Sequence, residues 1–262
     1  MRALGIDVGS LNVKAVILNG VGAEYSASLP AADGAEATSK LVMEDLIRKA
    51  EINQDGAYIV ATGVGSKAAS FCQQQKAITT CLARGVNRLF PTARMVIDMG
   101  AETSTVLKIN ERGRVTDWAG QDKCAAGTGM FVQAMAKIMQ VSLDEMSEYS
   151  MRSKGKADIT GTCAVFAESE VISHIHRVPP TPKEDIIAGI HSSMVSRVMG
   201  LLKRLGIEKD VAVVGGVARN KGLVAILERE LGFNVLVPEN PEMVAALGAA
   251  ILARESIDRG MK

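Results

Sequence analysis

Two stretches of the chain repeat one pattern. Residues 4–18 read LGIDVGSLNVKAVIL, and residues 95–109 read MVIDMGAETSTVLKI. In each, an Asp is followed by an apolar residue, a Gly, a small residue and a β-rich run, which predicts a strand, a tight turn and a returning strand. Two unrelated hairpins could share such a turn. Here, however, the Asp, the Gly and the β pattern all match when Asp7 is aligned with Asp98. The repeat therefore predicts two similar α/β halves.

Helical and β-rich segments alternate through the rest of the chain. This alternation is typical of the α/β class and predicts a largely parallel sheet in each half. Ser142 stands three residues before Glu145, the spacing of a capping box at the start of a helix. Strands are expected in segments 57–65, 210–220 and 235–238. Helices are expected over residues 35–50, 66–89, 127–140, from Ser142 onward, and over 164–176, 183–205 and 241–254.

Composition limits the classes of function. The 262 residues suffice for two modest domains, and 47% are apolar while 3% are aromatic. The formal net charge of +1 gives no basic stripe for nucleic acid or for an anionic membrane surface. The first residues, MRALGIDVGS, read as strand and turn rather than as a signal peptide, and no apolar run is long enough to span a bilayer. We therefore expect a cytoplasmic protein without nucleic-acid or membrane partners, in which disulfides are rare.

The first glycine turn has the residues of a phosphate site. Successive backbone N–H groups in such a turn point into one concavity, which binds anions without a charged side chain. Gly9 allows close approach and Ser10 adds a hydroxyl group. Asp7 can hold Mg²⁺, which prefers oxygen ligands and keeps several waters. Lys14, on the returning strand, could reach a phosphate.

Two further glycine turns extend the pattern. Asp98, Gly100 and Ala101 form the second phosphate turn, and two such turns could hold one polyphosphate. Gly215 and Gly216 lie in VVGGVARN, where a strand meets a helix and where small residues let an adenine ring lie against the backbone. One glycine turn would be weak evidence, but three in this order are more specific.

These turns resemble those of the superfamily of sugar kinases, actin and heat-shock chaperone ATPases. GIDVGS resembles its first phosphate motif, DMGAE its second and VVGGVA its adenosine motif. The resemblance implies two ribonuclease-H-like domains around a nucleotide cleft with ATP or ADP and Mg²⁺. We place the first domain at residues 1–93 plus about 240–262, and the second at 94–239. The nucleotide contacts expected from it are Gly9, Ser10, Leu11, Asn12, Lys14, Gly100, Ala101, Gly127, Thr128, Gly129, Gly215, Gly216, Val217, Ala218 and Asn220.

Two cysteines stand before helical runs. Cys124 lies in KCAAGTGMF and Cys163 in GTCAVFAESE. A thiolate at a helix N-terminus lies near the positive end of the helix dipole and can bind a metal or cluster. Two thiolates are too few for a four-cysteine iron–sulfur site, but a two-fold dimer would supply four. Two buried thiols are the alternative, since cysteine is often buried.

The sequence motifs around these cysteines, together with two others, point to one family within the superfamily. DKCAAGTGMF, TCAVFAESEVIS, IIAGIHSSMVSRV and GGVARN closely resemble the activator ATPases of 2-hydroxyacyl-CoA dehydratases and the ATPase subunits of benzoyl-CoA reductases, the BadF/BadG/BcrA/BcrD type. The resemblance implies that Cys124 and Cys163 bind one 4Fe–4S cluster per dimer, formed with an identical or paralogous subunit. It also implies that ATP hydrolysis drives a low-potential electron to a CoA-thioester dehydratase or reductase, with a ferredoxin or flavodoxin as donor.

The second phosphate turn departs from that family. Its activators usually read DIGGQD there, whereas this chain reads DMGAET over residues 98–103. Ala101 in place of Gly makes the turn less permissive. Glu102 stands where Gln would face the γ-phosphate and the attacking water, so we count it with Asp7 and Asp98 as catalytic. This departure favours a reductase-type ATPase subunit over a dehydratase activator.

Other candidate residues have plainer interpretations. Cys72 and Cys81 fall on the expected helix 66–89 and are interpreted as buried thiols. Glu168 and Glu170 follow Cys163 and are interpreted as solvated helix positions, and His191 as packed or on the surface.

Two other functions fit the same superfamily. A small-molecule kinase, such as a sugar or amino-sugar kinase, would need a base in the cleft and no cysteines. A cytoskeletal or chaperone-like ATPase would lack redox chemistry. A brown colour after anaerobic purification would support the electron-transfer protein alone.

Overall fold

The computed structural model describes residues 1–262 except 20–21, 33, 52–55, 121–126, 161–162 and 261–262. Packing divides the chain into two compact units. The first holds residues 1–93, 109–116 and 242–262, and the second holds 94–108 and 117–241. The ribonuclease-H-like domain limits expected from the sequence stay a prediction, because compact packing alone does not show which segments fold together.

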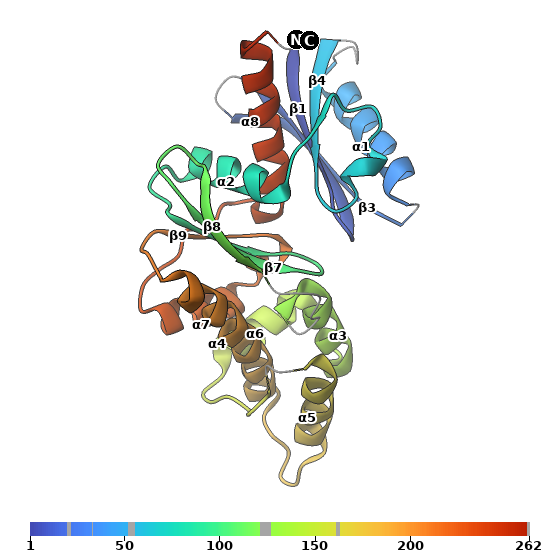
Figure 1. Ribbon diagram of the computed structural model, residues 1–262. Coiled ribbons are helices and arrows are strands. Elements are labelled where there is room, and N and C mark those ends of the chain that lie inside the picture. The colour runs from blue at the N-terminus through green and yellow to red at the C-terminus, as the bar shows by residue number, and fades with distance from the viewer. Residues whose placement is uncertain (20–21, 33, 52–55, 121–126, 161–162, 261–262) are drawn as a thin grey trace. The chain divides into compact units, whose positions relative to one another are not determined.

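The first unit is a five-stranded mixed sheet with helices on both faces (Figure 1). The strand order is β3-β2-β1-β4-β5, with β1 antiparallel to β2 and parallel to β4. Its elements are β1 Arg2–Val8, β2 Asn12–Asn19, β3 Gly22–Pro30, α1 Ala35–Lys49, β4 Ala57–Thr62, the 3₁₀ turn η2 Ser66–Ala68, β5 Gln74–Gln75, α2 Ile78–Leu89 and α8 Val244–Asp258.

Alternation along β1 decides what each face of this sheet packs against. Leu4, Ile6 and Val8 share one core with α1, because every second side chain of a strand points to the same face. Gly5, on the other face, lies under α8, where a Cβ atom would come 2.1 Å from the Ala246 carbonyl oxygen. Gly5 and the small residues of α8 therefore let that helix lie directly on the strand that carries Asp7.

The second unit is a four-stranded sheet with a helical layer. The strand order is β8-β7-β6-β9, with β6 antiparallel to β7 and parallel to β9. Its main core joins β6 to the packed helices. The elements are β6 Met95–Met99, β7 Ser104–Ile109, β8 Val115–Gly120, α3 Gly129–Met139, α4 Leu143–Arg152, α5 Ala164–His176, α6 Lys183–Leu205, β9 Val211–Val214, the 3₁₀ turn η4 Gly216–Arg219, α7 Lys221–Leu231 and the 3₁₀ turn η5 Pro241–Met243, which crosses into the first unit.

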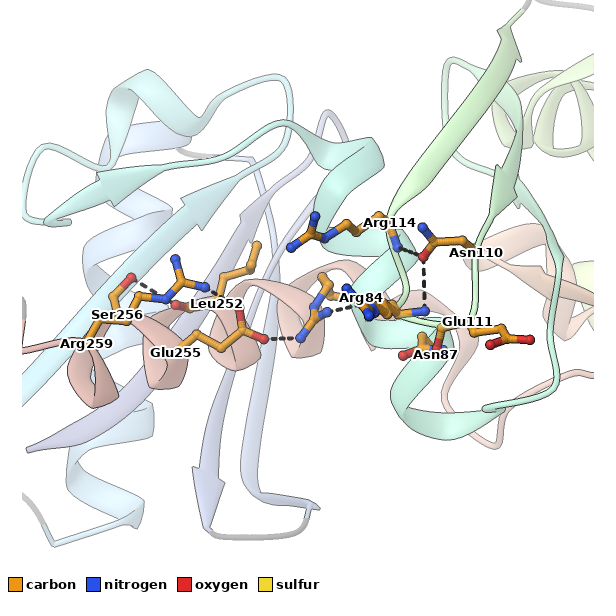
Figure 2. A network of polar contacts seen from close by, with 10 residues as sticks. Arg84, Asn87, Asn110, Glu111, Arg114, Leu252, Glu255, Ser256 and Arg259 are labelled. Atoms are coloured by element: carbon orange, nitrogen blue, oxygen red, sulfur yellow. Dashed lines mark hydrogen bonds and ion pairs between the residues drawn. The ribbon is translucent and has the colours of Figure 1, made fainter.

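The tip of the β7–β8 hairpin, residues 109–116, packs within the first unit (Figure 2). Asn110 closes the tip, since its side-chain oxygen accepts the N–H groups of Arg112 and Arg114 at 3.0 and 3.1 Å. Arg84 on α2 donates to the Arg112 carbonyl at 2.7 Å and pairs with Glu255 on α8. The tip is therefore bonded to α2 through Arg84, which is itself paired with α8.

Several expectations about the elements are confirmed. The two hairpins form as expected, helices cover 164–176 and 183–205, and Ser142 and Glu145 make the capping box of α4. The α/β class is confirmed as well. Among the described residues, no helix is both long and apolar enough to cross a bilayer.

Three expectations were wrong. Each sheet is mixed rather than largely parallel, because the glycine turns join antiparallel neighbours. The helix expected over 66–89 begins only at Ile78. Before it, Ala69, Phe71 and Cys72 pack against the core from irregular chain, and their spacing in the sequence resembles that of a helix. Segment 235–238 makes a single bridge, from Leu236 to Ala212, rather than a strand.

Candidate functional site

The first phosphate turn is built around a buried aspartate. Asp7 is 4% exposed and lies opposite Lys14 in the β1–β2 ladder. The Lys14 ammonium lies 2.9 Å from Asp7 Oδ2. Burial raises the pKa of Asp7, and the charge of Lys14 acts against that shift. The turn is closed by the Gly9 N–H, which donates to the Asn12 carbonyl at 3.1 Å.

A glycine that the sequence analysis missed lies under this turn. Thr62 pairs with Asp7 in the parallel ladder, and Gly63 follows it with a φ of +93°. A Cβ atom on Gly63 would lie 2.5 Å from both Asp7 Oδ1 and the Val8 carbonyl oxygen. A side chain there would meet main-chain atoms that cannot move aside, so Gly63 is needed for the shape of the turn.

The second turn repeats this backbone arrangement. Asp98, 8% exposed, lies opposite Thr105, and the Gly100 N–H donates to the Thr103 carbonyl at 2.9 Å. Gly215 follows the parallel strand β9 with a φ of +88°. A Cβ atom there would lie 2.7 Å from Asp98 Oδ1 and 2.4 Å from the Met99 carbonyl oxygen. The repeat thus includes the parallel strand and its glycine, whose sequence signal is TGVGS beside VGGVA.

The start of α3 packs on the second turn. The Gly129 and Met130 N–H groups donate to the carbonyls of Gly100 and Ala101, both at 2.9 Å. Gly129 also lies against Val217, in the turn from Gly215 to Asn220, where a Cβ atom would be 3.3 Å from Val217 Cγ2. The structure therefore brings the second phosphate turn, the start of α3 and the turn from Gly215 to Asn220 together in one unit.

The remaining expected nucleotide contacts lie in two groups. Ser10, Leu11 and Asn12 lie on the first turn, where the Leu11 carbonyl accepts from the Ala31 N–H at 2.9 Å. Glu102 is exposed on the second turn. The other residues are buried or half-buried near the second turn, apart from Gly216, which is exposed: Gly127, Thr128, Gly216, Val217, Ala218 and Asn220. Their contacts with a nucleotide stay a prediction.

Cys163 lies at the N-terminus of α5, as its N-cap residue. It is half-buried, and its side chain makes no capping hydrogen bond, so the sulfur is not used by the helix. Cys124 lies outside the described residues. Within the described part of the chain, no three His, Cys, Asp or Glu side chains form a metal-binding group.

The other cysteines and acids differ in their surroundings. Cys81 is buried on α2, and burial raises the pKa of its thiol to about 12. Cys72 is half-buried and lies outside any helix. Glu168 is exposed, whereas Glu170 accepts the Thr160 N–H at 2.5 Å and so holds the chain that leads to α5. The solvated interpretation was wrong for Glu170, because its carboxylate faces a main-chain donor.

Comparisons with known proteins agree with one another. A model described as the BadF/BadG/BcrA/BcrD ATPase family matches residues 4–253. The chain is 41% identical to a 2-hydroxyisocaproyl-CoA dehydratase activator of Clostridioides difficile, covering 100% of this chain and 98% of that protein. It is 30% identical to a subunit of the benzoyl-CoA reductase of Thauera aromatica, covering 94% of this chain and 91% of that protein.

A solved structure of a dehydratase activator is also similar to this chain. The activator of the 2-hydroxyisocaproyl-CoA dehydratase from Clostridium difficile with bound ADPNP superposes with a TM-score of 0.90, at 39% identity, over 99% of this chain and 98% of that one.

Proposed function

The chain belongs to the BadF/BadG/BcrA/BcrD ATPase family, and on that premise we propose that it hydrolyses ATP to deliver a low-potential electron to an enzyme acting on a CoA thioester. The observation that carries the proposal is the pair of matching turns, at Asp7 and at Asp98, each with its glycine on the parallel strand. The ADPNP bound by a relative of nearly the same length supports ATP and ADP as the nucleotides.

Asp7 is the residue best suited to Mg²⁺. Its Oδ1 is buried and has no hydrogen-bond partner among the described residues, so one carboxylate oxygen is left for a hard cation. Asp98, on the second turn, would add a carboxylate near the Mg²⁺, and Glu102 would orient the attacking water. Bound Mg²⁺ would neutralise charge on the phosphates. The backbone N–H groups of Ser10 and Ala101 and the Lys14 ammonium would hold those phosphates.

Cys163 suits a cluster shared between two chains. Its sulfur is half-buried at a helix N-terminus and is not used in capping, and Cys124 would supply the second thiolate. A 4Fe–4S cluster supplies one-electron chemistry at low potential. Two chains, identical or paralogous, would provide the four thiolates. A ferredoxin or flavodoxin would donate the electron, and the cytoplasm is the compartment that suits such carriers.

The partner is a 2-hydroxyacyl-CoA dehydratase in this proposal. The expected reductase-type subunit is less well supported, since identity is 41% to a dehydratase activator and 30% to a benzoyl-CoA reductase subunit. Both names favour an electron-delivering ATPase over a sugar or amino-sugar kinase.

Replacing one cysteine tests the cluster, with another cysteine as matched control. After anaerobic preparation we expect about four irons per wild-type dimer. Cys163→Ala should lose the iron, weaken the dimer and keep its Kd for ADP within about twofold, because the turns contain no cysteine. Cys72→Ala should match wild type in all three measurements. Full iron content in Cys163→Ala would overturn the cluster assignment and leave the ATPase assignment standing.

A further inference from the structure

His191 is a fully buried histidine on α6, with an exposed fraction of 0%. Its Nε2 lies 3.1 Å from Nδ2 of Asn220. Asn220 is the N-cap residue of α7, where its Oδ1 accepts the Leu223 N–H at 3.0 Å. Since the amide oxygen takes the capping donor, the amide nitrogen faces His191 and donates to it. Nε2 is therefore an acceptor, and the ring hydrogen is on Nδ1.

The ring stays neutral at the pH at which proteins work. Burial lowers the pKa of His191 to about 4, with no charged neighbour contributing to the shift. Glu228 of α7 is half-buried and accepts the Val235 N–H at 3.0 Å. The other charged residues of α4 and α7, which pack on α6, are exposed: Asp144, Glu145, Glu148, Arg152, Lys221, Arg229 and Glu230. On α3 and α5, which also contact α6, Lys137, Glu168 and His176 are exposed, while Glu170 and His174 are half-buried and bond to Thr160 and Thr181. A protonated ring could not accept from Asn220. Because the ring is neutral near pH 7, it keeps this hydrogen bond there.

Asn220 ends the glycine-rich turn that begins at Gly215. The turn is closed by main-chain hydrogen bonds, from the Ala218 N–H to Gly215 and from the Asn220 N–H to Val217, at 3.1 and 3.0 Å. Both polar atoms of the Asn220 side chain are engaged, one with α7 and one with His191. This side chain is therefore committed to holding the turn between two helices.

We propose that His191 is a positioning residue for nucleotide binding, which acts by fixing Asn220 and with it the turn from Gly215 to Asn220. The proposal rests on the proposed function, in which adenosine lies against this turn. Nδ1 of the ring has no hydrogen-bond partner within the described residues, so the bond to Asn220 is the polar contact that the structure gives this buried ring.

Replacing His191 by Leu or by Gln separates the hydrogen bond from packing. Leu fills similar space but leaves the Asn220 amide without its buried acceptor. We expect the Kd for ADP and the KM for ATP to rise about tenfold, with kcat within about twofold. The amide oxygen of Gln reaches about as far as Nε2, so His191→Gln should restore both constants to within about twofold of wild type.

Ser142→Ala is the matched control. Ser142 caps α4, which packs on α6 and α7, and its side chain bonds to Glu145 within its own helix start. Its loss should lower the midpoint of urea denaturation, because the helix loses its N-cap, and should leave the Kd for ADP within about twofold.

The outcomes distinguish the two proposals. A wild-type chain that does not bind ADP overturns the proposed function and this inference with it. A wild-type chain that binds ADP, with an unchanged Kd in His191→Leu, overturns the inference alone. If His191→Leu does not fold, His191→Asn replaces it, because its amide is too short to reach Asn220; equal Kd values for the Asn and Gln variants would overturn the inference.

Discussion

The two phosphate turns share a scaffold and differ in charge. In both, an aspartate on the central strand is followed by a glycine whose N–H closes the turn, and a glycine with positive φ lies on the parallel neighbour. The residue opposite the aspartate is Lys14 in the first turn and Thr105 in the second. In the second turn, the N-terminus of α3 packs on the turn carbonyls instead. Geometry is thus kept in both halves, while the residue opposite the aspartate in the antiparallel ladder is charged in the first turn and neutral in the second.

The largest expected effect is on catalysis. Asp7→Asn should lower ATP hydrolysis by about 10³-fold, because it removes the carboxylate proposed to hold Mg²⁺. Asp98→Asn should lower it less, by about 10²-fold, since the second turn supports the site mainly through its backbone. Steady-state phosphate release measures both, and iron content should stay at the wild-type level in each. Equal activity of Asp7→Asn and wild type would show that the first turn is not the metal site.

The shared scaffold predicts equal costs in the two halves. Gly63→Ala and Gly215→Ala should each lower the free energy of unfolding by about 3 kcal/mol, from positive φ and from close contact with main-chain atoms. Gly216→Ala is a matched control, because nothing lies within 4 Å of a Cβ atom there. Urea denaturation compares the three. If Gly63→Ala kept the wild-type free energy of unfolding while Gly215→Ala lost stability, the two turns would not be equivalent.

Lys14 lies opposite Asp7, whereas the neutral Thr105 lies opposite Asp98. Replacing Lys14 should therefore change the stability of the protein by an amount that depends on pH. Lys14 opposes the rise that burial causes in the pKa of Asp7. A carboxyl group whose pKa is raised on folding adds stability below its unfolded pKa, and that stability is lost as the pH rises through the folded pKa. Lys14→Met should therefore destabilise the protein by about 2 kcal/mol at pH 8 and by less at pH 5.

Thr105→Val is the corresponding variant in the second turn. It should change stability by less than about 1 kcal/mol, with the same change at both pH values. Chemical denaturation without nucleotide or Mg²⁺ gives these values. A loss for Lys14→Met that is larger at pH 5 than at pH 8 would contradict the sign.

The smallest effect is expected at Ala101. The sequence suggested that Ala in place of Gly restricts the second turn, but Ala101 is not among the described residues with positive φ. Ala101→Gly should therefore relieve no strain and should cost up to about 1 kcal/mol through greater freedom of the unfolded chain. A clear gain in stability, measured by thermal unfolding, would show that the turn is strained.

Sequence reasoning was most successful where residues repeat in register. The two turns at Asp7 and Asp98 were predicted correctly because Asp, Gly and the returning strand follow one another in the chain. Gly63 was missed because its role comes from a parallel neighbour far along the sequence. His191 could be placed no better than packed or exposed, since its bond to Asn220 depends on how α6 and α7 pack. The first part of the helix expected over 66–89, before Ile78, is not helical, because buried irregular chain also brings apolar residues to the core at short intervals.

ATP dependence of electron delivery tests the central claim most directly. The chemically reduced protein would be mixed anaerobically with a 2-hydroxyacyl-CoA dehydratase, and reduction of the dehydratase followed with ATP, with ADP and without nucleotide. We expect reduction with ATP only, a rate about 10³-fold lower for Asp7→Asn and no reduction by Cys163→Ala, which lacks the proposed thiolate. Equal reduction with and without ATP, or full reduction by Cys163→Ala, would contradict the account.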